Sequence, residues 1–534
     1  MAASFPIGTS ANRADKSALP VETELKLSLP AAQAKQLWKV PPLSTLLVNK
    51  PTRQRLFSAY YDTPHLDLHK RGVALRLRRH GRRWVQTVKT ESRPSGGLQQ
   101  RVELEVVVPR GVLDQEWLKH TGLSEFSDGG VATNALGIIF TTEFDRSFAV
   151  IEPEEGTRVE VSIDQGAVVA GTKREPVCEV ELELKQGELG PLFDLAEQLV
   201  ALPDIRIETV SKAQRGYRLV ARERPAPVKA ISSKLSGSAD VDAVFKTLAF
   251  ECIAQMQANE HGVLHSRDIE YVHQARVALR RLRSVFSVFS TALPKSHFND
   301  QLTWLRDTSR MLGVARDWDV FVTEFLPDAA NSMTGYPELA ELTKTAGRLC
   351  AEARRRVRME LVSTDYEIQM LRLTRMLHAQ DWGRDRNMKE QEIAALAPKA
   401  FAASILGRSH RKVVRQGKRL DHSNLNRSNY SGFHQLRINI KKLRYASELL
   451  APLFANKSTR KYLANLADLQ KILGQLNDAA TAANLIDRLA PGNDDPAYLQ
   501  AIAHLKGYAA AKSRFSLSDF NSVWKKFVAT AAFW

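Results

Sequence analysis

Cysteine is scarce in this sequence, because the 534 residues contain only Cys178, Cys252 and Cys350. Their wide spacing matches neither a disulfide framework nor a zinc motif, since both need cysteines at short, repeated intervals. Disulfide-rich secreted domains and cysteine-based zinc domains are therefore excluded. Unpaired cysteines are typical of a reducing compartment, so we expect a cytoplasmic protein.

Long apolar runs are also missing. No stretch approaches the roughly 18 consecutive apolar residues that a membrane-spanning helix requires. The first residues lack the continuous apolar core of a secretory signal, and their composition predicts a disordered tail over residues 1–20. We therefore expect neither a membrane span nor a membrane partner.

Acidic side chains are too few to balance the basic ones. The chain carries 76 Lys and Arg against 59 Asp and Glu, which gives a formal net charge of +17. Most of the excess lies in residues 241–534, which hold 43 basic and 29 acidic side chains. Such an excess indicates a polyanionic partner, either nucleic acid or a phosphate-rich molecule.

Two kinds of pattern divide the chain. Short stretches of alternating apolar and polar residues, typical of β-strands, occupy 21–29, 56–61, 73–79, 84–89, 101–108, 158–164 and 177–185. Residues 188–201 and 209–221 have helical periodicity, and long helical patterns fill residues 241–534. The segment 222–240 between them is rich in Pro, Ser and Lys, which predicts a linker. We therefore expect an α+β protein with a strand-rich domain over 21–221 and a helical domain over 241–534.

Charged side chains recur at every second position of the predicted strands, so each set lies on one face of its strand. Glu22, Glu24 and Lys26 share a face of the first strand, whereas the opposite faces are consistently apolar. One interpretation is an antiparallel sheet with a solvated face. The other is a closed barrel of about eight strands, whose interior is wide enough for side chains and one small ligand.

A barrel interior would bring the two kinds of charge together. Carboxylates such as Glu179 and Glu181 could bind a hard divalent cation through oxygen. Guanidinium groups such as Arg76 and Arg78 match phosphate oxygens in a bidentate way. Neither set is stable when buried alone, because an unpaired buried charge costs several kcal/mol. Bound metal and phosphate would compensate both sets, which is the equipment of phosphoryl transfer.

The ordered motifs of residues 20–220 resemble the CYTH superfamily, the triphosphate tunnel metalloenzymes. The resemblance rests on ETELK (22–26), YYDTP (60–64), GVALRLRR (72–79), QTVK (86–89), RVELE (101–105), Asp164, EVE (179–181) and SKAQRG (211–216). It implies an eight-stranded antiparallel β tunnel with flanking helices. It also implies that the tunnel binds triphosphate compounds and hydrolyses or cyclises them with Mg²⁺ or Mn²⁺.

The same resemblance implies roles for individual residues. Metal binding would fall to Glu22, Glu24, Asp164, Glu179 and Glu181. Triphosphate binding would fall to Lys26, Arg76, Arg78, Lys89, Arg146 and Lys212. Catalysis would depend on Glu24 and Lys26, with Glu24 and a second metal activating water. Arg101, Glu103 and Glu105 are further candidates for the interior, and Glu183 is expected near its mouth.

The helical half contains an internal duplication. VHQARVALRRLRS (272–284) aligns with FHQLRINIKKLRY (433–445), and MLGVARDWD (311–319) aligns with ILGQLNDAA (472–480). Both pairs are offset by 161 residues, which indicates two copies of one unit. We therefore predict an all-α duplicated helical bundle with repeats over about 241–390 and 395–530.

Each copy carries a basic helical face. The first consists of His273, Arg276, Arg280 and Arg283, and the second of His434, Arg437, Lys441 and Arg444. Like charges on one helix face are destabilising unless an anion binds them. The duplicated pattern resembles the CHAD domain family, which implies binding of inorganic polyphosphate at these faces. Lys441 and Lys442 replace arginines in the second copy, and Asn477 stands where the first has Arg316.

These patterns favour a metal-dependent inorganic triphosphatase that hydrolyses tripolyphosphate to pyrophosphate and phosphate. Three alternatives remain at this stage. The same fold could act on thiamine triphosphate or a nucleoside triphosphate, or cyclise ATP. The protein could be a non-catalytic polyphosphate-anchored scaffold. Nucleic-acid binding is disfavoured, because charge is present without an RRM, KH or helix-turn-helix signature.

Overall fold

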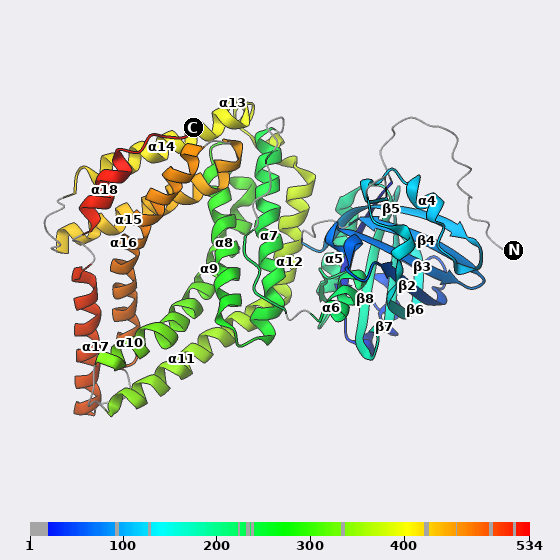
Figure 1. Ribbon diagram of the computed structural model, residues 1–534, viewed down its shortest axis with the longest axis horizontal. Helices are drawn as coiled ribbons and strands as arrows, with labels where there is room; N and C mark the ends of the chain where they lie inside the picture. Colours follow the sequence, from blue (N-terminus) through cyan, green and yellow to red (C-terminus); the bar gives the residue numbers. More distant parts are fainter. Residues whose placement is uncertain are drawn as a thin grey trace. The chain divides into compact units, whose positions relative to one another are not determined.

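The computed structural model describes residues 20–90, 96–126, 130–222, 225–230, 235, 240–332, 337–420, 427–454, 457–490, 495–515 and 519–534. The expected N-terminal tail, apart from Pro20, and much of the expected linker lie outside these residues. The chain divides into two compact units, residues 1–224 and 225–534 (Figure 1). None of the helices in the described part combines the length and hydrophobicity needed to cross a membrane.

A closed antiparallel barrel forms the first unit. Its strands are β1 (Val21–Ser28), β2 (Thr52–Asp62), β3 (Val73–His80), β4 (Arg83–Thr90), β5 (Leu98–Val108), β6 (Gly137–Glu154), β7 (Thr157–Ala170) and β8 (Lys173–Gln186). They follow the order β5-β4-β3-β2-β6-β7-β8-β1, and pairing of β1 with β5 closes the ring. The short strand β9 (Arg206–Ile207) adds to β1. The predicted eight-stranded barrel is therefore confirmed.

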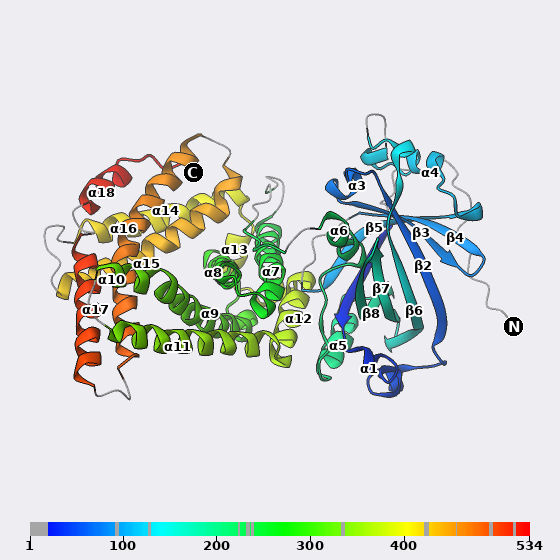
Figure 2. The same ribbon diagram turned by 60° about the horizontal axis from the view of Figure 1, so that its bottom comes forward.

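Helices cover the outside of this barrel. The short ones are α1 (Ala31–Ala34), α2 (Leu43–Leu46), α3 (Asp67–Lys70) and α4 (Gln115–Lys119). The longer helices α5 (Leu189–Val200) and α6 (Lys212–Ala221) lie against the long strands (Figure 2). Helix α5 packs on β1, β6 and β8, and α6 packs on β6 and β7.

The inverted burial of the first strand follows from this arrangement. Leu25 and Leu27 of β1 point outward and are fully buried, as is Leu182 of β8. The apolar side of α5, including Leu192 and Phe193, is fully buried as well. The apolar strand faces are thus covered by helices, whereas the alternate, charged positions point into the barrel. The strands are charged on the inside because their outside forms the hydrophobic core.

The longest strand was not predicted from the sequence. Strand β6 spans 18 residues and pairs with both β2 and β7. Its alternation is broken at both ends by adjacent apolar residues, and the pairing is irregular near Tyr61 and between Ile151 and Glu154. The strand nevertheless places Arg146 directly opposite Asp164 of β7.

The second unit is entirely helical in the described residues. Its helices are α7 (Val241–His265), α8 (Ile269–Phe289), α9 (Asn299–Val320), α10 (Leu326–Ser332), α11 (Glu338–Leu361), α12 (Thr364–Ala379), α13 (Met388–Ala394), α14 (Pro398–Gly417), α15 (Arg427–Leu450), α16 (Lys457–Asp487), α17 (Pro496–Phe515) and α18 (Phe520–Val528). A π-helical segment, Phe321–Phe325, joins α9 to α10. The predicted helical fold of this half is confirmed.

The duplication appears as two series of successive antiparallel neighbours. Helices α7, α8 and α9 pack in sequence, and α14, α15 and α16 do the same. The first copy of the basic motif lies on α8 and the second on α15, and these two helices contact each other. Aromatic clusters fill both halves, with Phe245 and Trp382 in the first and Tyr462 and Phe527 in the second.

Candidate active site

The barrel encloses a cavity of about 670 Å³ whose wall is predominantly charged. Side chains from all eight barrel strands and from α6 line it. Nine of the eleven predicted metal- and triphosphate-binding residues are in this lining: Glu22, Glu24, Lys26, Arg76, Arg78, Lys89, Arg146, Glu181 and Lys212. The further candidates Arg101, Glu103, Glu105 and Glu183 line it as well, whereas Asp164 and Glu179 lie behind the lining. The interpretation as an open, solvated sheet face is therefore wrong, because these side chains converge on an enclosed space.

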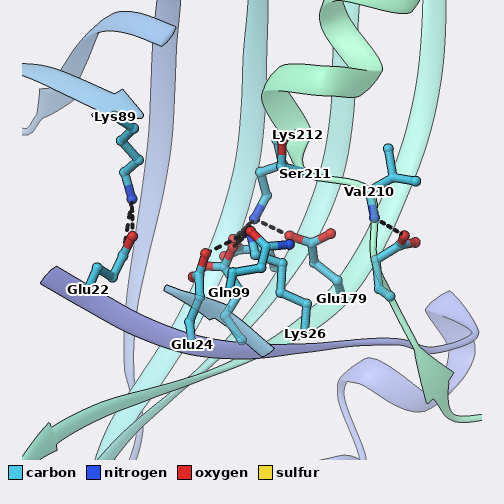
Figure 3. Close-up of polar contacts among 12 residues, drawn as sticks. Glu22, Glu24, Lys26, Lys89, Gln99, Glu179, Val210, Ser211 and Lys212 are labelled. Carbon is cyan, nitrogen blue, oxygen red and sulfur yellow. Dashed lines mark hydrogen bonds and ion pairs between the residues drawn. The ribbon is translucent and has the colours of Figure 1, made fainter. Parts of the chain in front are cut away.

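Three carboxylates form a triad on neighbouring strands. Asp164 of β7 lies directly opposite Glu179 of β8, and Glu181 follows two residues later on the same face. One oxygen from each lies within 4.8 Å of the others, and this group, here called the carboxylate triad, could hold a metal ion. The Lys212 ammonium lies at its centre, with Nζ 2.6 Å from Asp164 Oδ2 and 2.5 Å from Glu179 Oε1 (Figure 3).

The surrounding cations decide the charge of the triad. Burial raises the pKa of Glu181, but Lys212, Lys26 and Arg146 oppose it and hold that pKa well below its usual range. The pKa of Asp164 is also lowered, because Lys212 and Arg146 outweigh the effect of burial. Burial prevails at Glu179 and raises its pKa. The triad therefore keeps at least two carboxylates ionised at neutral pH.

These donors fit a hard divalent cation. All three offer carboxylate oxygens, the ligand type that Mg²⁺ and Mn²⁺ prefer. Both carboxylate oxygens of Glu179 are buried, and the Lys212 ammonium lies 2.5 Å from one of them. A buried carboxylate is costly unless a cation compensates it. The triad is thus suited to metal binding, and the sequence had singled out all three of its members.

The other two predicted metal ligands lie apart from the triad. Glu22 accepts from Lys89 at 2.8 Å and from Arg101 at 3.0 Å. Arg101 also pairs with Glu24, which lies 3.4 Å from Lys26 Nζ. Glu22 and Glu24 therefore face the same cavity, but the partners described here are the cations Lys26, Lys89 and Arg101. Burial alone would raise the pKa of Glu22. Lys89 and Arg101 outweigh burial and hold that pKa well below its usual range.

The cationic wall contains one guanidinium that lacks a carboxylate partner. Arg76 pairs with Glu103 at 3.2 Å, whereas Arg78 donates to Ser58 Oγ at 3.2 Å and forms no ion pair with any described residue. Burial, together with the neighbouring Arg76 and Arg146, lowers the pKa of Arg78 to about 10. Tyr60 lies beside these arginines with its ring stacked on Phe140. The wall is therefore short of negative charge where Arg78 faces the cavity.

Helix α6 is fixed over the barrel by the residues around Lys212. Ser211 and Gln214 form a capping box that begins the helix at Lys212. Arg215 forms ion pairs with Glu175 and Glu208. Gly216 permits close packing, because a Cβ there would lie 2.2 Å from the ring of Phe140. The SKAQRG motif thus explains how a helical lysine reaches the triad.

Two residues of the cavity, Arg101 and Glu103, received no role from the sequence. Arg101 bridges Glu22 and Glu24, and Glu103 accepts from Arg76 and Lys89. Burial and the neighbouring Glu22 raise the pKa of Glu103 to about 7. The period-two charge pattern of residues 101–105 was the available signal, and it had marked both only as candidates for the interior.

The first basic face of the helical unit lies between α8 and α9. His273, Arg276 and Arg280 are partly buried on α8, and Arg276 Nε approaches within 3.7 Å of where a Cβ of Gly313 on α9 would stand. Burial and the neighbouring Arg316, with smaller effects of Arg280 and Arg276, lower the pKa of His273. The predicted residues His273, Arg276 and Arg280 therefore form one cationic cluster with Arg316.

Two further features of α8 are Arg283, the fourth residue of the first basic face, and the contact of Arg280 with the second copy of the motif. Arg283 is exposed, and burial together with Arg306 and Arg310 lowers its pKa. The Arg280 guanidinium lies 4.8 Å from the ring centre of Tyr445 on α15. This cation–π contact joins the two copies of the motif.

The second basic face is different in detail. His434 is exposed, and Arg437 and Lys441 are partly buried on α15. Arg444 Nε donates to Glu448 at 2.7 Å, so its charge is already compensated. The side chains of Asn477 and Asp478 lie outside the described residues.

Family models match two separate parts of the chain. Residues 21–217 match the CYTH domain, and residues 247–487 match the CHAD domain. These two matches identify a CYTH domain and a CHAD domain within the chain. Both resemblances indicated by the sequence motifs are thereby confirmed.

Similar proteins match one part of the chain or the other. An inorganic triphosphatase from Haemophilus influenzae is 33% identical over 205 residues, which are 38% of this chain and 56% of that protein. The chain thus spans just over half the length of this curated relative. The CHAD domain from the plant Ricinus communis is 27% identical, with a TM-score of 0.48 over 57% of this chain and 98% of that one. HpAC1 from Hippeastrum, a putative adenylyl cyclase with a dominant triphosphatase activity, is 20% identical, with a TM-score of 0.26 over 36% and 91%.

Proposed function

We propose that this protein is a metal-dependent inorganic triphosphatase that hydrolyses tripolyphosphate to pyrophosphate and phosphate. The observation that carries the proposal is one cavity inside the barrel, in which Glu181 of the carboxylate triad and Arg78, which has no described carboxylate partner, both line the wall. The name of the Haemophilus influenzae relative supports the same activity. In this proposal the triphosphate supplies the negative charge that the wall lacks.

The triad would hold the metal, Mg²⁺ or Mn²⁺, in this enzyme. When bound, such an ion would supply Lewis-acid chemistry, since a divalent cation stabilises negative charge on phosphate oxygens and lowers the pKa of water. Arg76, Arg78 and Lys89 would bind the phosphate chain, since guanidinium and ammonium groups donate several charge-assisted hydrogen bonds to phosphate oxygens. The barrel wall would exclude bulk water, which strengthens these contacts.

Glu24 and Lys26 would act at the reacting phosphate. Both side chains are only 3% exposed and lie on the cavity side of β1. Arg101 and Lys26 keep Glu24 in a fixed position, where it could orient the attacking water. Burial alone would lower the pKa of Lys26, but Glu181 and Glu24 outweigh burial and raise it. Lys26 would therefore stay charged as negative charge develops on the phosphate.

For the helical unit we propose binding of inorganic polyphosphate at the two basic faces. The first face supports this best, because His273 Nδ1 and Arg280 Nε are buried without hydrogen-bond partners. A polyanion would satisfy these donors and relieve the repulsion within the cluster.

A phosphate-release panel tests the catalytic proposal. Purified full-length protein with Mg²⁺ or Mn²⁺ is given tripolyphosphate, ATP, thiamine triphosphate and long-chain polyphosphate. Release from tripolyphosphate should be much the fastest, and Glu24→Ala should abolish it. Equal rates on ATP would move the assignment to an organic triphosphate, and no release from any compound would contradict an enzyme.

A further inference from the structure

Lys212 occupies the point at which the carboxylate triad converges. Besides Asp164 and Glu179, its Nζ lies 2.9 Å from Glu181 Oε1, so one ammonium contacts all three carboxylates. A divalent cation bound by the same oxygens needs the same position, because Mg²⁺ keeps its ligands at about 2.0–2.1 Å. Lysine and metal therefore exclude one another at this point.

We propose that Lys212 is an exchangeable counter-ion, which holds the triad until metal enters and then moves to the triphosphate. The inference rests on the proposed function, since it takes the triad as the metal site. It makes Lys212 the residue through which metal binding and triphosphate binding become cooperative.

The surroundings allow this side chain to move while the triad stays in place. The capping box, the Arg215 ion pairs and the close packing at Gly216 also fix α6, and they involve groups other than the Lys212 side chain. That side chain also lines the cavity and has a flexible four-carbon stem. Arg146 remains on the triad, donating to Asp164 at 2.7 and 2.6 Å from another strand.

The charge of the cavity decides when the exchange is favourable. Without an anion, Lys212 would leave three carboxylates for a space in which the other carboxylates already pair with cations such as Arg76 and Lys89, and in which Arg78 has no described carboxylate partner. Like charges there would oppose the move, so metal alone should bind weakly. A bound polyanion gives the ammonium a new partner, which should strengthen metal binding. Coupling of this kind is reciprocal, so metal should strengthen polyanion binding by the same factor.

Mn²⁺ binding to the full-length, metal-free protein tests the exchange. Electron paramagnetic resonance reports bound Mn²⁺ with and without pyrophosphate as the polyanion, after correction for Mn²⁺–pyrophosphate complexes. We expect pyrophosphate to tighten Mn²⁺ binding to the wild type by about tenfold or more, within the usual range of coupling between sites. Lys212→Met should bind Mn²⁺ more tightly than the wild type without pyrophosphate, and most of the coupling should be lost.

Lys185→Met is the matched control. Lys185 lines the same cavity but pairs with Glu183 at 2.6 Å and not with the triad. Its Mn²⁺ affinity and its coupling should stay close to those of the wild type. Equal Mn²⁺ affinities of wild type and Lys212→Met would overturn the exchange, as would full coupling in Lys212→Met.

Two further measurements keep the inference and the proposed function separate. In one outcome, Glu179→Gln abolishes Mn²⁺ binding and Lys212→Met leaves it unchanged. This outcome refutes the exchange but not the metal site. Mn²⁺ binding that is insensitive to Glu179→Gln refutes the metal site and with it the proposed function. If metal-free Lys212→Met does not fold, Mn²⁺ alone should restore folding, and a variant that stays unfolded at saturating Mn²⁺ overturns the exchange.

Discussion

Lys26 of β1 lies directly opposite Glu181 of β8, and its Nζ is 2.9 Å from Glu181 Oε1. The pair joins the two strands through the interior of the barrel, where 3% of Lys26 and 13% of the Glu181 side chain are exposed. The same two residues line the cavity, so the network that we propose to bind an anion also contributes to the stability of the barrel.

The first prediction concerns this pair. Lys26→Met should lower the free energy of unfolding of metal-free protein by roughly 3 kcal/mol, the lower end of the cost of breaking a buried pair. The lower end applies because Arg146 and Lys212 still contact Glu181. Denaturant unfolding measures the change. Lys185→Met serves as the control, because the Lys185 side chain is much more exposed than that of Lys26. This variant should lower the free energy of unfolding by at most about 1 kcal/mol.

The second prediction separates binding from stability at Arg78. Because this guanidinium has no described carboxylate partner, Arg78→Met should not lower the free energy of unfolding. The same change should reduce kcat/KM for tripolyphosphate by roughly 100-fold, the typical effect of losing one preorganised donor. Steady-state kinetics and denaturant unfolding measure the two effects.

Arg79→Met is the control for Arg78. Arg79 is the exposed neighbour, and its Nε donates to the carbonyl of Gly81. Its activity should match that of the wild type. A loss of stability in Arg78→Met comparable to its loss of activity would show that Arg78 is structural.

The third prediction concerns pH and Glu103. Burial and the nearby Glu22 raise the pKa of Glu103 to about 7, so the folded protein binds this proton more tightly than the unfolded chain. The resulting stability is fully present below pH 4.5, the ordinary value, and is lost as the pH rises through about 7. Glu103→Gln should therefore become more stable relative to the wild type between pH 5 and 8, by on the order of 1–3 kcal/mol.

Chemical denaturation in EDTA at several pH values measures this difference. Glu116→Gln, at an exposed position on α4, is the control and should track the wild type at every pH. A difference between Glu103→Gln and wild type that does not vary with pH would contradict the raised pKa.

The fourth prediction compares the two basic faces of the helical unit. Arg276→Glu should weaken binding of long-chain polyphosphate to the full-length protein more than Arg444→Glu, because Glu448 already compensates Arg444. Fluorescence anisotropy of labelled polyphosphate at two salt concentrations measures the affinities, and the Arg276 variant should have the smaller salt dependence. Equal losses in the two variants, or equal binding of random duplex DNA by the wild type, would contradict this assignment.

The sequence predicted the charged face of most strands because each strand carries that information locally, whereas the closed barrel was predicted from the family resemblance. A charged residue at every second position determines which face points inward, whatever the order of the strands. Strand β6 was missed because apolar residues such as Ile138 and Ile139 adjoin each other and obscure the alternation. Arg146 was nevertheless named as a candidate, and its side chain lines the cavity.

The partners within the cavity could not be predicted in the same way. Lys212 and Asp164 are 48 residues apart, and their contact depends on how α6 is placed over β7. Barrel closure also separates the five predicted metal ligands, because it pairs β1 with β5. Arg101 of β5 then contacts Glu22 and Glu24, which lie apart from the triad. Neither arrangement is encoded in the spacing of any single motif.

The most direct test of a metal and a triphosphate held together in the barrel is anomalous diffraction from crystals grown with Mn²⁺ and tripolyphosphate. The account predicts an anomalous peak among Asp164, Glu179 and Glu181, with phosphate density extending toward Arg78. Mn²⁺ found only outside the barrel, with the triphosphate absent from the cavity, would contradict it.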